Sequence, residues 1–599
     1  MAAPAQGQRG KRRVSRSMFP PEFVFGTATA AYQVEGAARE GGRGPSIWDE
    51  FSHTPGKTLN GDTGDVACDQ YHRFKEDIAL MVNMGMIAYC FSISWSRIMP
   101  SGWPPVNPEG VAYYSALIQA LLDHGITPYV TLFHWDLPLA LEKEFGGWRS
   151  PEIVPCFRTY ADTCFALFGR SAPHWITLNE PLCFTLCGYQ WGIHAPGRSS
   201  NRIISPQGGD SAREPYLVMH HLLLAHAAAV EAFRQRFGSH NGMSIGLAAD
   251  GEWAEPLTSS HADVEAAERR MQFQLAWVLD PLFSGDYPAV MKQRVGDRLP
   301  RFTPEQQQQL KGSLDFVGVN HYTSKFVSSA AAAAAPATAA PAAAAADAAA
   351  NTVMDNLAAM AAGAGTSGVV PLLPHESPAL ASSAQGRASE ESGAAGAAAV
   401  CGEDEGDHFK DQGVEILASR DGIPIGERAA SEWLYIVPWG FTKLLNWITV
   451  RYNRPPILIT ENGMDDDADA LPPLDRNSLS QPHIPGLQEN EAESPQQPYD
   501  SLHLPAALDD WKRVSFYDEY LGAVADAMRD GADVRGYFAW SLVDNFEWAM
   551  GYSRRFGIHY VDFTHGGARF PKRSALWWRH VLCGPQVTGT AAELSALGV

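Results

Sequence analysis

The sequence has 599 residues, of which 45% are hydrophobic and 11% aromatic, and its formal net charge is −21. A chain this apolar can bury a large core, so it is not disordered as a whole, and its length allows either about four domains or one large barrel with additions. The acidic balance argues against nucleic acid or an anionic membrane as a partner, because either requires a basic face.

The N-terminal segment, residues 1–18, is basic and carries no apolar run. It does not resemble a secretory signal peptide, and we interpret it as a disordered tail. The chain has no run of 18 apolar residues, so no membrane span is expected. It also has no Cys-x-x-Cys pair and no Asn-x-Ser/Thr sequon. We therefore expect free thiols and a cytoplasmic location, with a plastid as the alternative if the N-terminus belongs to a transit peptide.

Two polar stretches interrupt the rest of the chain. Residues 329–413 are rich in Ala, Pro, Gly and Ser, and residues 465–508 are rich in Pro, Gln, Asn and Glu. Neither composition can build a packed core, so we predict two low-complexity insertions in one domain over residues 19–583. Residues 584–599 are expected to form a loose tail. A G-x-G-x-x-G match at Gly363–Gly368 follows no strand, so we interpret it as a coincidence of composition.

Eight short apolar runs alternate with helical patterns along the predicted domain. The runs are nearly continuous in apolar residues, which is typical of parallel strands buried on both faces. They are Phe23–Ala28, Ala88–Ser94, Thr127–Phe133, His174–Leu178, Met243–Ala248, Phe316–Asn320, Ile457–Thr460 and Gly536–Ser541.

The helical patterns between these runs have recognisable boundaries. After the second run, Asn107 is a plausible N-cap, Pro108 suits the first helical position, and the pattern stops at Gly125. Eight strand–helix units predict an α/β fold of the (β/α)8 barrel type. A doubly wound open sheet is the alternative, but the sequence after the first run lacks the glycine-rich turn that such a sheet carries.

Polar and aromatic residues follow seven of the eight predicted strands. In a (β/α)8 barrel the active site lies at these strand ends, and such residues are costly to bury by chance. In chain order they are Gln33, Glu35, Arg97, His134, Trp135, Asp136, Asn179, Glu180, Asn320, His321, Tyr322, Glu461, Asn462, Trp540, Asp544, Asn545, Glu547 and Trp548. Carboxylates and amides bind sugar hydroxyls and Trp rings stack on sugar CH faces, so this set predicts a carbohydrate site.

Seven ordered segments resemble glycoside hydrolase family 1, the β-glucosidase family. Trp175–Pro181 and Ile459–Gly463 resemble its two signature motifs. The other five segments are Phe25–Gly36, Phe91–Ile98, Thr131–Pro138, Gly318–Thr323 and Trp540–Trp548. The resemblance runs from about residue 19 to about residue 582, apart from the two insertions, and implies the barrel fold already predicted.

The resemblance implies a retaining β-glycosidase that hydrolyses O-β-glycosidic bonds through a covalent glycosyl-enzyme, with β-glucosidase as the preferred activity. Glu180 is then the expected general acid and base, and Glu461 the expected nucleophile. Arg97 is expected beside Glu461, where its charge would keep the carboxylate ionised. Asn179 is expected to bind the 2-hydroxyl of the sugar, and Tyr322 to hydrogen-bond Glu461.

The resemblance also assigns the substrate pocket. Its expected residues are Gln33, His134, Asn320, Trp433, Trp540, Glu547, Trp548 and Phe556. Among them, Trp540 is the stacking platform, Trp433 lies at the aglycone entrance, and Phe556 lies near the sugar O6. The Glu547 carboxylate would repel a phosphate, so an unphosphorylated glucoside, galactoside or fucoside is expected.

The implied partner is a small-molecule β-glycoside. Neither a metal nor a cofactor is expected. The sequence does not indicate an oligomeric state. The alternatives are a transglycosylase on the same site or a catalytically idle sugar-binding scaffold.

Overall fold

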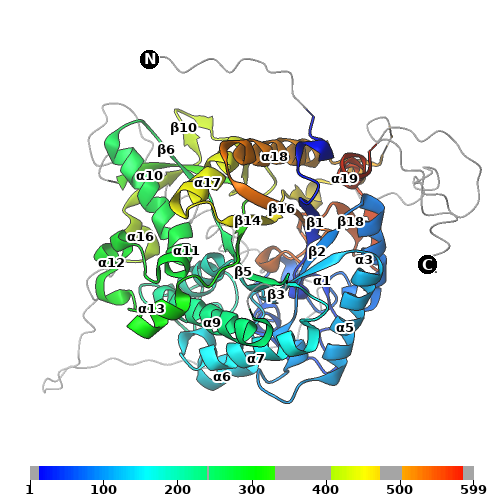
Figure 1. The fold of residues 1–599 in the computed structure, drawn as a ribbon, viewed down its shortest axis with the longest axis horizontal. Helices are drawn as coiled ribbons and strands as arrows, with labels where there is room; N and C mark the ends of the chain where they lie inside the picture. The colour runs from blue at the N-terminus through cyan, green and yellow to red at the C-terminus, as the bar shows by residue number, and fades with distance from the viewer. Residues whose placement is uncertain (1–12, 239–241, 331–405, 472–501, 503, 585–599) are drawn as a thin grey trace, which may run out of the picture.

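Eight parallel strands close into a barrel at the centre of the computed structural model (Figure 1). The structure describes residues 13–238, 242–330, 406–471, 502 and 504–584. Around the barrel the strands follow the order β1-β16-β14-β7-β5-β4-β3-β2. They are β1 (Val24–Ala28), β2 (Ala88–Ser92), β3 (Thr127–Phe133), β4 (His174–Asn179), β5 (Ser244–Asp250), β7 (Phe316–Asn320), β14 (Pro456–Asn462) and β16 (Asp533–Trp540). The eight predicted strands and the (β/α)8 fold class are confirmed.

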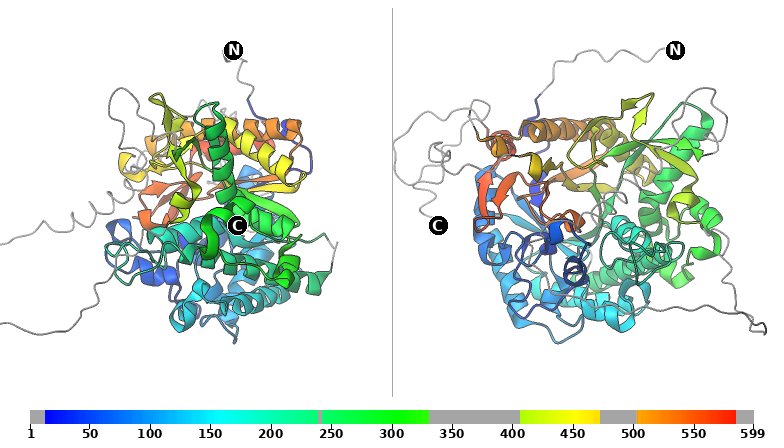
Figure 2. Two further views of the ribbon diagram at one scale, coloured as in Figure 1. Left: turned by 90° about the vertical axis from the view of Figure 1, so that its left-hand side faces the viewer. Right: turned by 180° about the vertical axis from the view of Figure 1, so that it is seen from behind.

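A long helix follows each barrel strand, and these helices surround the sheet (Figures 1 and 2). They are α3 (Gln70–Met84), α5 (Pro108–Asp123), α7 (Ile153–Phe168), α9 (Glu214–Phe237), α11 (Leu275–Ser284), α17 (Pro438–Arg451), α18 (Trp511–Asp530) and α19 (Arg573–Cys583). Helix α5 begins as predicted, because the Asn107 side chain accepts a hydrogen bond from the Glu109 N–H and Pro108 occupies the first turn.

Further helices and strands lie in the connections. The helices are α1 (Ala31–Val34), α2 (Ile47–Ser52), α4 (Trp95–Ile98), α6 (Leu139–Phe145), α8 (Pro181–Leu186), α10 (His261–Phe273), α12 (Ala289–Val295), α13 (Pro304–Leu310) and α16 (His408–Gln412). The strands that bear on the site are β6 (Trp253–Pro256), β8 (Ser324–Ser329), β9 (Val414–Leu417), β15 (Asp466–Asp467), β17 (Arg554–Arg555), β18 (His559–Asp562) and β19 (Ala568–Pro571).

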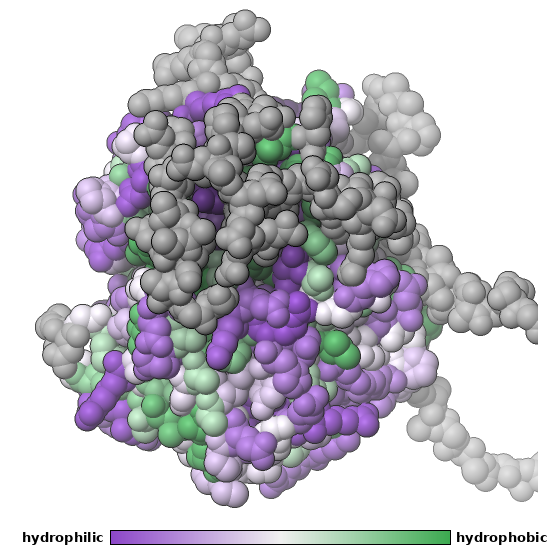
Figure 3. All heavy atoms as spheres, turned by 90° about the vertical axis from the view of Figure 1, so that its right-hand side faces the viewer, coloured by the Kyte–Doolittle hydropathy of each residue, from purple (hydrophilic) through white to green (hydrophobic). Residues whose placement is uncertain are grey.

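The barrel strands are buried on both faces. Every residue of β2 and β7 is buried, which explains why the apolar runs in the sequence are continuous rather than alternating. Outside the strands, Trp578 on α19 is fully buried and packs against Phe25 of β1. On the face shown in Figure 3, polar residues cover most of the described surface, and hydrophobic residues lie between them.

Helix α9 is the only helix in the described part of the chain that is long and apolar enough to cross a membrane. The protein itself buries 78% of its most apolar window. Its histidines make structural contacts: His226 Nδ1 lies 2.6 Å from Thr177 Oγ1, and His221 Nδ1 lies 2.8 Å from the Trp148 carbonyl oxygen. Across the described ranges, no three His, Cys, Asp or Glu side chains are grouped so as to hold a metal ion.

The edges of both predicted insertions belong to the packed structure. Residues 406–413 contain α16, whose His408 is fully buried, and Arg298 binds the Asp411 carboxylate at 2.5 Å. The boundary expected at residue 413 therefore lies too late in the chain. In the second stretch, Asp465 is buried and accepts a hydrogen bond of 2.5 Å from the Ser431 hydroxyl. Residues 331–405 and 472–501 lie outside the described residues, and the division of the chain into a domain with insertions stays a prediction.

Candidate active site

Glu180 begins the loop after β4 in a left-handed conformation, with φ at 46°. Pro181 follows at the first position of α8, and the residue before a proline avoids the right-handed helical region. The Glu180 N–H still donates to the Ala248 carbonyl oxygen of β5 at 2.8 Å. The side chain is thereby fixed at the strand end, and such strained conformations of non-glycine residues concentrate at functional sites.

Asn320, at the end of β7, connects Glu180 to neighbouring strands. Its Nδ2 donates to Glu180 Oε1 at 2.8 Å and to Asn179 Oδ1 at 3.0 Å. The Thr460 hydroxyl donates to Asn320 Oδ1 at 2.5 Å. Asn179 Nδ2 in turn lies 3.0 Å from His134 Nε2. These amides fix the orientation of the Glu180 carboxyl group.

Glu461 lies within β14, next to β7 in the barrel, and is 5% exposed. The Tyr322 hydroxyl donates a hydrogen bond of 2.7 Å to Glu461 Oε2, as the sequence predicts. Burial raises the pKa of Glu461 to about 8, although the Tyr322 hydrogen bond lowers it. Cys90 lies on β2. Burial and then the charge of Glu461 raise the pKa of its thiol to about 12.

Arg97 does not take its expected place beside Glu461. Its Nε donates to Glu35 Oε2 at 3.0 Å and its Nη2 to the Gly36 carbonyl oxygen at 3.1 Å. The Tyr114 hydroxyl donates to the other Glu35 oxygen at 2.6 Å. The prediction that Arg97 holds Glu461 ionised is therefore wrong, because a carboxylate from the first strand end takes this guanidinium.

Glu180 and Glu461 influence each other electrostatically. Glu180 is 7% exposed, and burial, followed by the charge of Glu461, raises its pKa to about 8. When like charges share a buried site, the pair loses its protons in two separate steps. The hydrogen bond from the Tyr322 hydroxyl favours ionised Glu461, and the charge of Glu461 in turn favours protonated Glu180. One carboxylate and one carboxylic acid is the state that glycoside cleavage requires.

The residues expected to bind the sugar surround this pair. Gln33 Nε2 donates to Glu547 Oε2 at 3.2 Å and to the Phe546 carbonyl oxygen at 3.0 Å. The His134 ring stacks between two Trp rings, with centroids 6.1 Å from Trp540 and 5.9 Å from Trp548. Burial lowers the pKa of His134 to about 3, so its ring is neutral.

Two further expected residues lie on either side of Tyr322. The rings of Trp433 and Phe556 each pack edge-on against Tyr322, with centroids 6.0 Å away. Phe556 is buried, whereas Trp433 is 43% exposed. The exposed Trp433 suits the entrance and the buried Phe556 suits the interior, so their places agree with the aglycone and sugar sides. Their roles toward substrate stay predictions.

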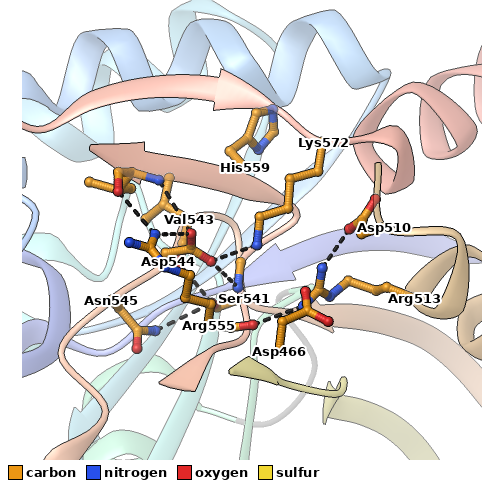
Figure 4. A network of polar contacts seen from close by, with 12 residues as sticks. Asp466, Asp510, Arg513, Ser541, Val543, Asp544, Asn545, Arg555, His559 and Lys572 are labelled. Atoms are coloured by element: carbon orange, nitrogen blue, oxygen red, sulfur yellow. Dashed lines mark hydrogen bonds and ion pairs between the residues drawn. The ribbon is translucent and has the colours of Figure 1, made fainter. Parts of the chain in front are cut away.

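A buried ionic network supports the loop after β16 (Figure 4). Asp544 lies between Lys572 Nζ at 2.8 Å and Arg555 Nη1 at 2.7 Å. Burial opposes ionisation of Asp544, but the two cations outweigh it and lower its pKa. Asp544 is three residues before Glu547, and Arg555 precedes Phe556. The network therefore fixes two segments that carry pocket residues.

Asp250, which ends β5, lies at the site and is not among the residues predicted from the sequence. Burial and then the charge of Glu180 raise its pKa well above the ordinary value. The fifth apolar run was ended at Ala248, two residues before the strand ends. A polar residue two positions after the end of that run was the available signal.

The whole chain is similar to known glycosidases. A family model described as Glycosyl hydrolase family 1 matches residues 15–472 and 490–584. Beta-glucosidase 42 of Arabidopsis thaliana is 44% identical over 574 residues, which cover 95% of this chain and 95% of that protein. Beta-glucosidase 6 of Oryza sativa subsp. japonica is 43% identical over 571 residues, covering 95% and 91%.

Solved structures have the same fold. A rice β-glucosidase, a glutamate-to-glutamine mutant in a covalent complex with Glc, matches with a TM-score of 0.76 and 42% identity, covering 95% of this chain and 99% of that one. A fungal β-glucosidase from Humicola insolens in complex with glucose matches with a TM-score of 0.74 and 38% identity, covering 95% and 98%.

Proposed function

The chain belongs to glycosyl hydrolase family 1 and is a retaining β-glycosidase, and from that premise we propose that Glu180 and Glu461 perform the cleavage of an unphosphorylated β-glucoside. The observation that carries the assignment is that two buried carboxyl groups, one after β4 and one in β14, are each held by a residue at or just after the end of β7. Asn320 binds Glu180 and Tyr322 binds Glu461.

In the first step, protonated Glu180 gives its proton to the glycosidic oxygen while the Glu461 carboxylate attacks the anomeric carbon. The carbon–oxygen bond to the aglycone breaks, and a glycosyl-enzyme forms on Glu461. In the second step, ionised Glu180 takes a proton from water, and the resulting hydroxide displaces Glu461. The rice relative in a covalent complex with Glc supports a covalent intermediate in this family.

We propose glucose as the preferred sugar, because the two curated relatives described above are named β-glucosidases. The Glu547 carboxylate, held by Gln33, would accept hydrogen bonds from two sugar hydroxyls and would repel a phosphate. A panel of aryl β-glycosides with glucose, galactose, fucose and 6-phosphoglucose tests this choice. Faster cleavage of the 6-phosphoglucoside than of the glucoside would contradict it.

The roles of the two glutamates predict different behaviour of two variants. Glu461→Gln should lose about 10³-fold or more in kcat on every aryl β-glucoside, because no glycosyl-enzyme can form. Glu180→Ala should still release a good leaving group in a burst, and azide should accelerate turnover by attacking the glycosyl-enzyme. The azide product should have the β configuration, as measured by NMR.

Glu109→Gln is the matched control, since Glu109 is an exposed carboxylate on α5. It should retain wild-type kcat and show no response to azide. Wild-type turnover by Glu461→Gln, or an α-configured azide product from Glu180→Ala, would overturn the assignment.

We also propose a cytoplasmic location. The seven cysteines among the described residues are free thiols, which supports a reducing compartment. A C-terminal fluorescent fusion of the full chain tests this, and import into plastids would favour the alternative.

A further inference from the structure

Cys183 and Cys187 lie one helical turn apart, three and seven residues after Glu180. The Sγ atoms of Cys183 and Cys187 are 3.7 Å apart, and the Cys187 N–H donates to the Cys183 carbonyl oxygen, as in a regular helix. Cys183 is partly exposed and Cys187 is 7% exposed. A reagent can therefore reach one thiol first and then find the second beside it.

This geometry does not suit a disulfide. Helical residues four apart have Cβ atoms about 5–6 Å apart, whereas a disulfide requires about 3.5–4.5 Å. The sulfur separation instead resembles that of two thiolates on one tetrahedral centre, about 3.8 Å for zinc. A zinc site needs further protein ligands, and none of the described ranges groups three metal-ligating side chains. Trivalent arsenic needs only two thiolates, because it brings its own third substituent.

Asp250 supplies a second, independent feature of the same place. It ends β5, which packs against α8, and its buried Oδ1 has no hydrogen-bond partner within the described residues. An unpartnered carboxyl oxygen of this kind can accept a hydrogen bond from a hydroxyl group of a ligand. Arsenous acid bound by two thiolates keeps one As–OH group, which can donate to it.

We propose that Cys183 and Cys187 form a binding site for trivalent arsenic, and that its occupation silences the neighbouring acid Glu180. In the reaction two As–OH groups of As(OH)3 are replaced by two As–S bonds, and the two thiol protons leave with them as two water molecules. No oxidation state changes. Cys183 follows Glu180 by only three residues, so an arsenic atom on its sulfur would lie beside the acid and obstruct it.

Only the effect on activity rests on the proposed function of Glu180, while arsenic binding is independent of it. Sodium arsenite and phenylarsine oxide are the probes, applied to the reduced full-length enzyme. We expect one arsenic per chain by intact mass and near-complete loss of aryl β-glucosidase activity. A dimercaptan should restore activity and an equal concentration of a monothiol should not, because only the dimercaptan competes with a paired dithiol.

Cys187→Ala is the decisive variant, because Cys187 does not contact Glu180. It should keep wild-type activity and lose both the stable arsenic adduct and the inactivation. Cys164→Ala and Cys401→Ala are controls that should still bind one arsenic at Cys183 and Cys187. Retention of the adduct in Cys187→Ala, or its loss in either control, would overturn the proposal. If the enzyme were not a β-glucosidase, the mass measurement would still test the site.

Discussion

The neighbours of Glu180 and Glu461 favour different protonation states of the two carboxyl groups. Tyr322 donates only to Glu461, so it favours the ionised nucleophile. Glu180 titrates beside that charge, which raises its pKa further. Because burial raises the pKa of both groups, the working form, with one proton on Glu180, should predominate at higher pH than for free carboxyl groups.

Tyr322→Phe tests whether the Tyr322 hydroxyl favours the ionised form of Glu461. Its hydroxyl stabilises ionised Glu461, so its loss raises the pKa of the nucleophile, and the acid limb of kcat/KM should move up by about 1–2 pH units. The alkaline limb, which reports loss of the Glu180 proton near pH 8, should stay in place. A pH profile on an aryl β-glucoside measures both limbs.

Tyr452→Phe is the control, since its hydroxyl, at the end of the outer helix α17, donates at 2.8 Å to Asp280 of α11 rather than to a pocket residue. That variant should keep both limbs. An unchanged acid limb in Tyr322→Phe would show that this hydroxyl does not set the charge of Glu461.

Replacing Arg97 should change the stability of the protein but not its pH profile. Arg97→Met leaves Glu35 buried without its cation, which should cost about 3–5 kcal/mol in the free energy of unfolding. The acid limb of the pH profile should not move, because the guanidinium lies on Glu35 rather than Glu461. Urea unfolding measures the first effect. A shifted acid limb with unchanged stability would restore the role that the sequence suggested for Arg97.

At the scale of strands and loops, the sequence predicts position well and side-chain direction poorly. Continuous apolar runs identify every barrel strand, because burial on both faces leaves no other pattern. The strand ends then bring Asn320, Glu180 and Glu461 to one face. Which carboxylate takes Arg97 depends on loop geometry, since Glu35 lies 62 residues earlier. Asp250 was missed because strand boundaries are uncertain by about two residues.

The turn after β14 depends on a glycine. A Cβ on Gly463 would lie 1.9 Å from the carbonyl oxygen of Trp540, the expected stacking platform. Gly463→Ala should therefore displace Trp540 and lower the free energy of unfolding by about 1–3 kcal/mol. KM for aryl β-glucosides should rise as the platform shifts. Thermal unfolding and steady-state kinetics measure these effects.

Gly522→Ala is the matched control on α18, where a Cβ would meet nothing within 4 Å. In a helix interior alanine is favoured over glycine by up to about 1 kcal/mol, so this variant should be as stable as the wild type or more so. Equal stability of the two alanine variants would contradict the close approach at Gly463.

At the scale of the whole molecule, the barrel accounts for the function without the residues outside the described ranges. Strands β7 and β14 pair directly, with Val317 opposite Ile457 and Asn320 opposite Glu461. The small sheet of β6, β8 and β9 is also complete, since Ser329 pairs with Val414. Described residues make all of these contacts, so neither closure of the barrel nor assembly of the acid pair requires residues 331–405.

Replacing residues 331–405 by a flexible linker of about 12 residues tests that independence. Such a linker can span more than 30 Å when extended, and shortening a loop changes its closure entropy by only about 1–2 kcal/mol. We expect kcat on a small aryl glucoside to be unchanged and Tm to shift by a few degrees at most. Because β8 lies after Tyr322 on the active-site side, KM for bulky aglycones is the quantity that the segment could alter. A loss of kcat on the small substrate, with the fold intact by circular dichroism, would show that residues 331–405 take part in the chemistry.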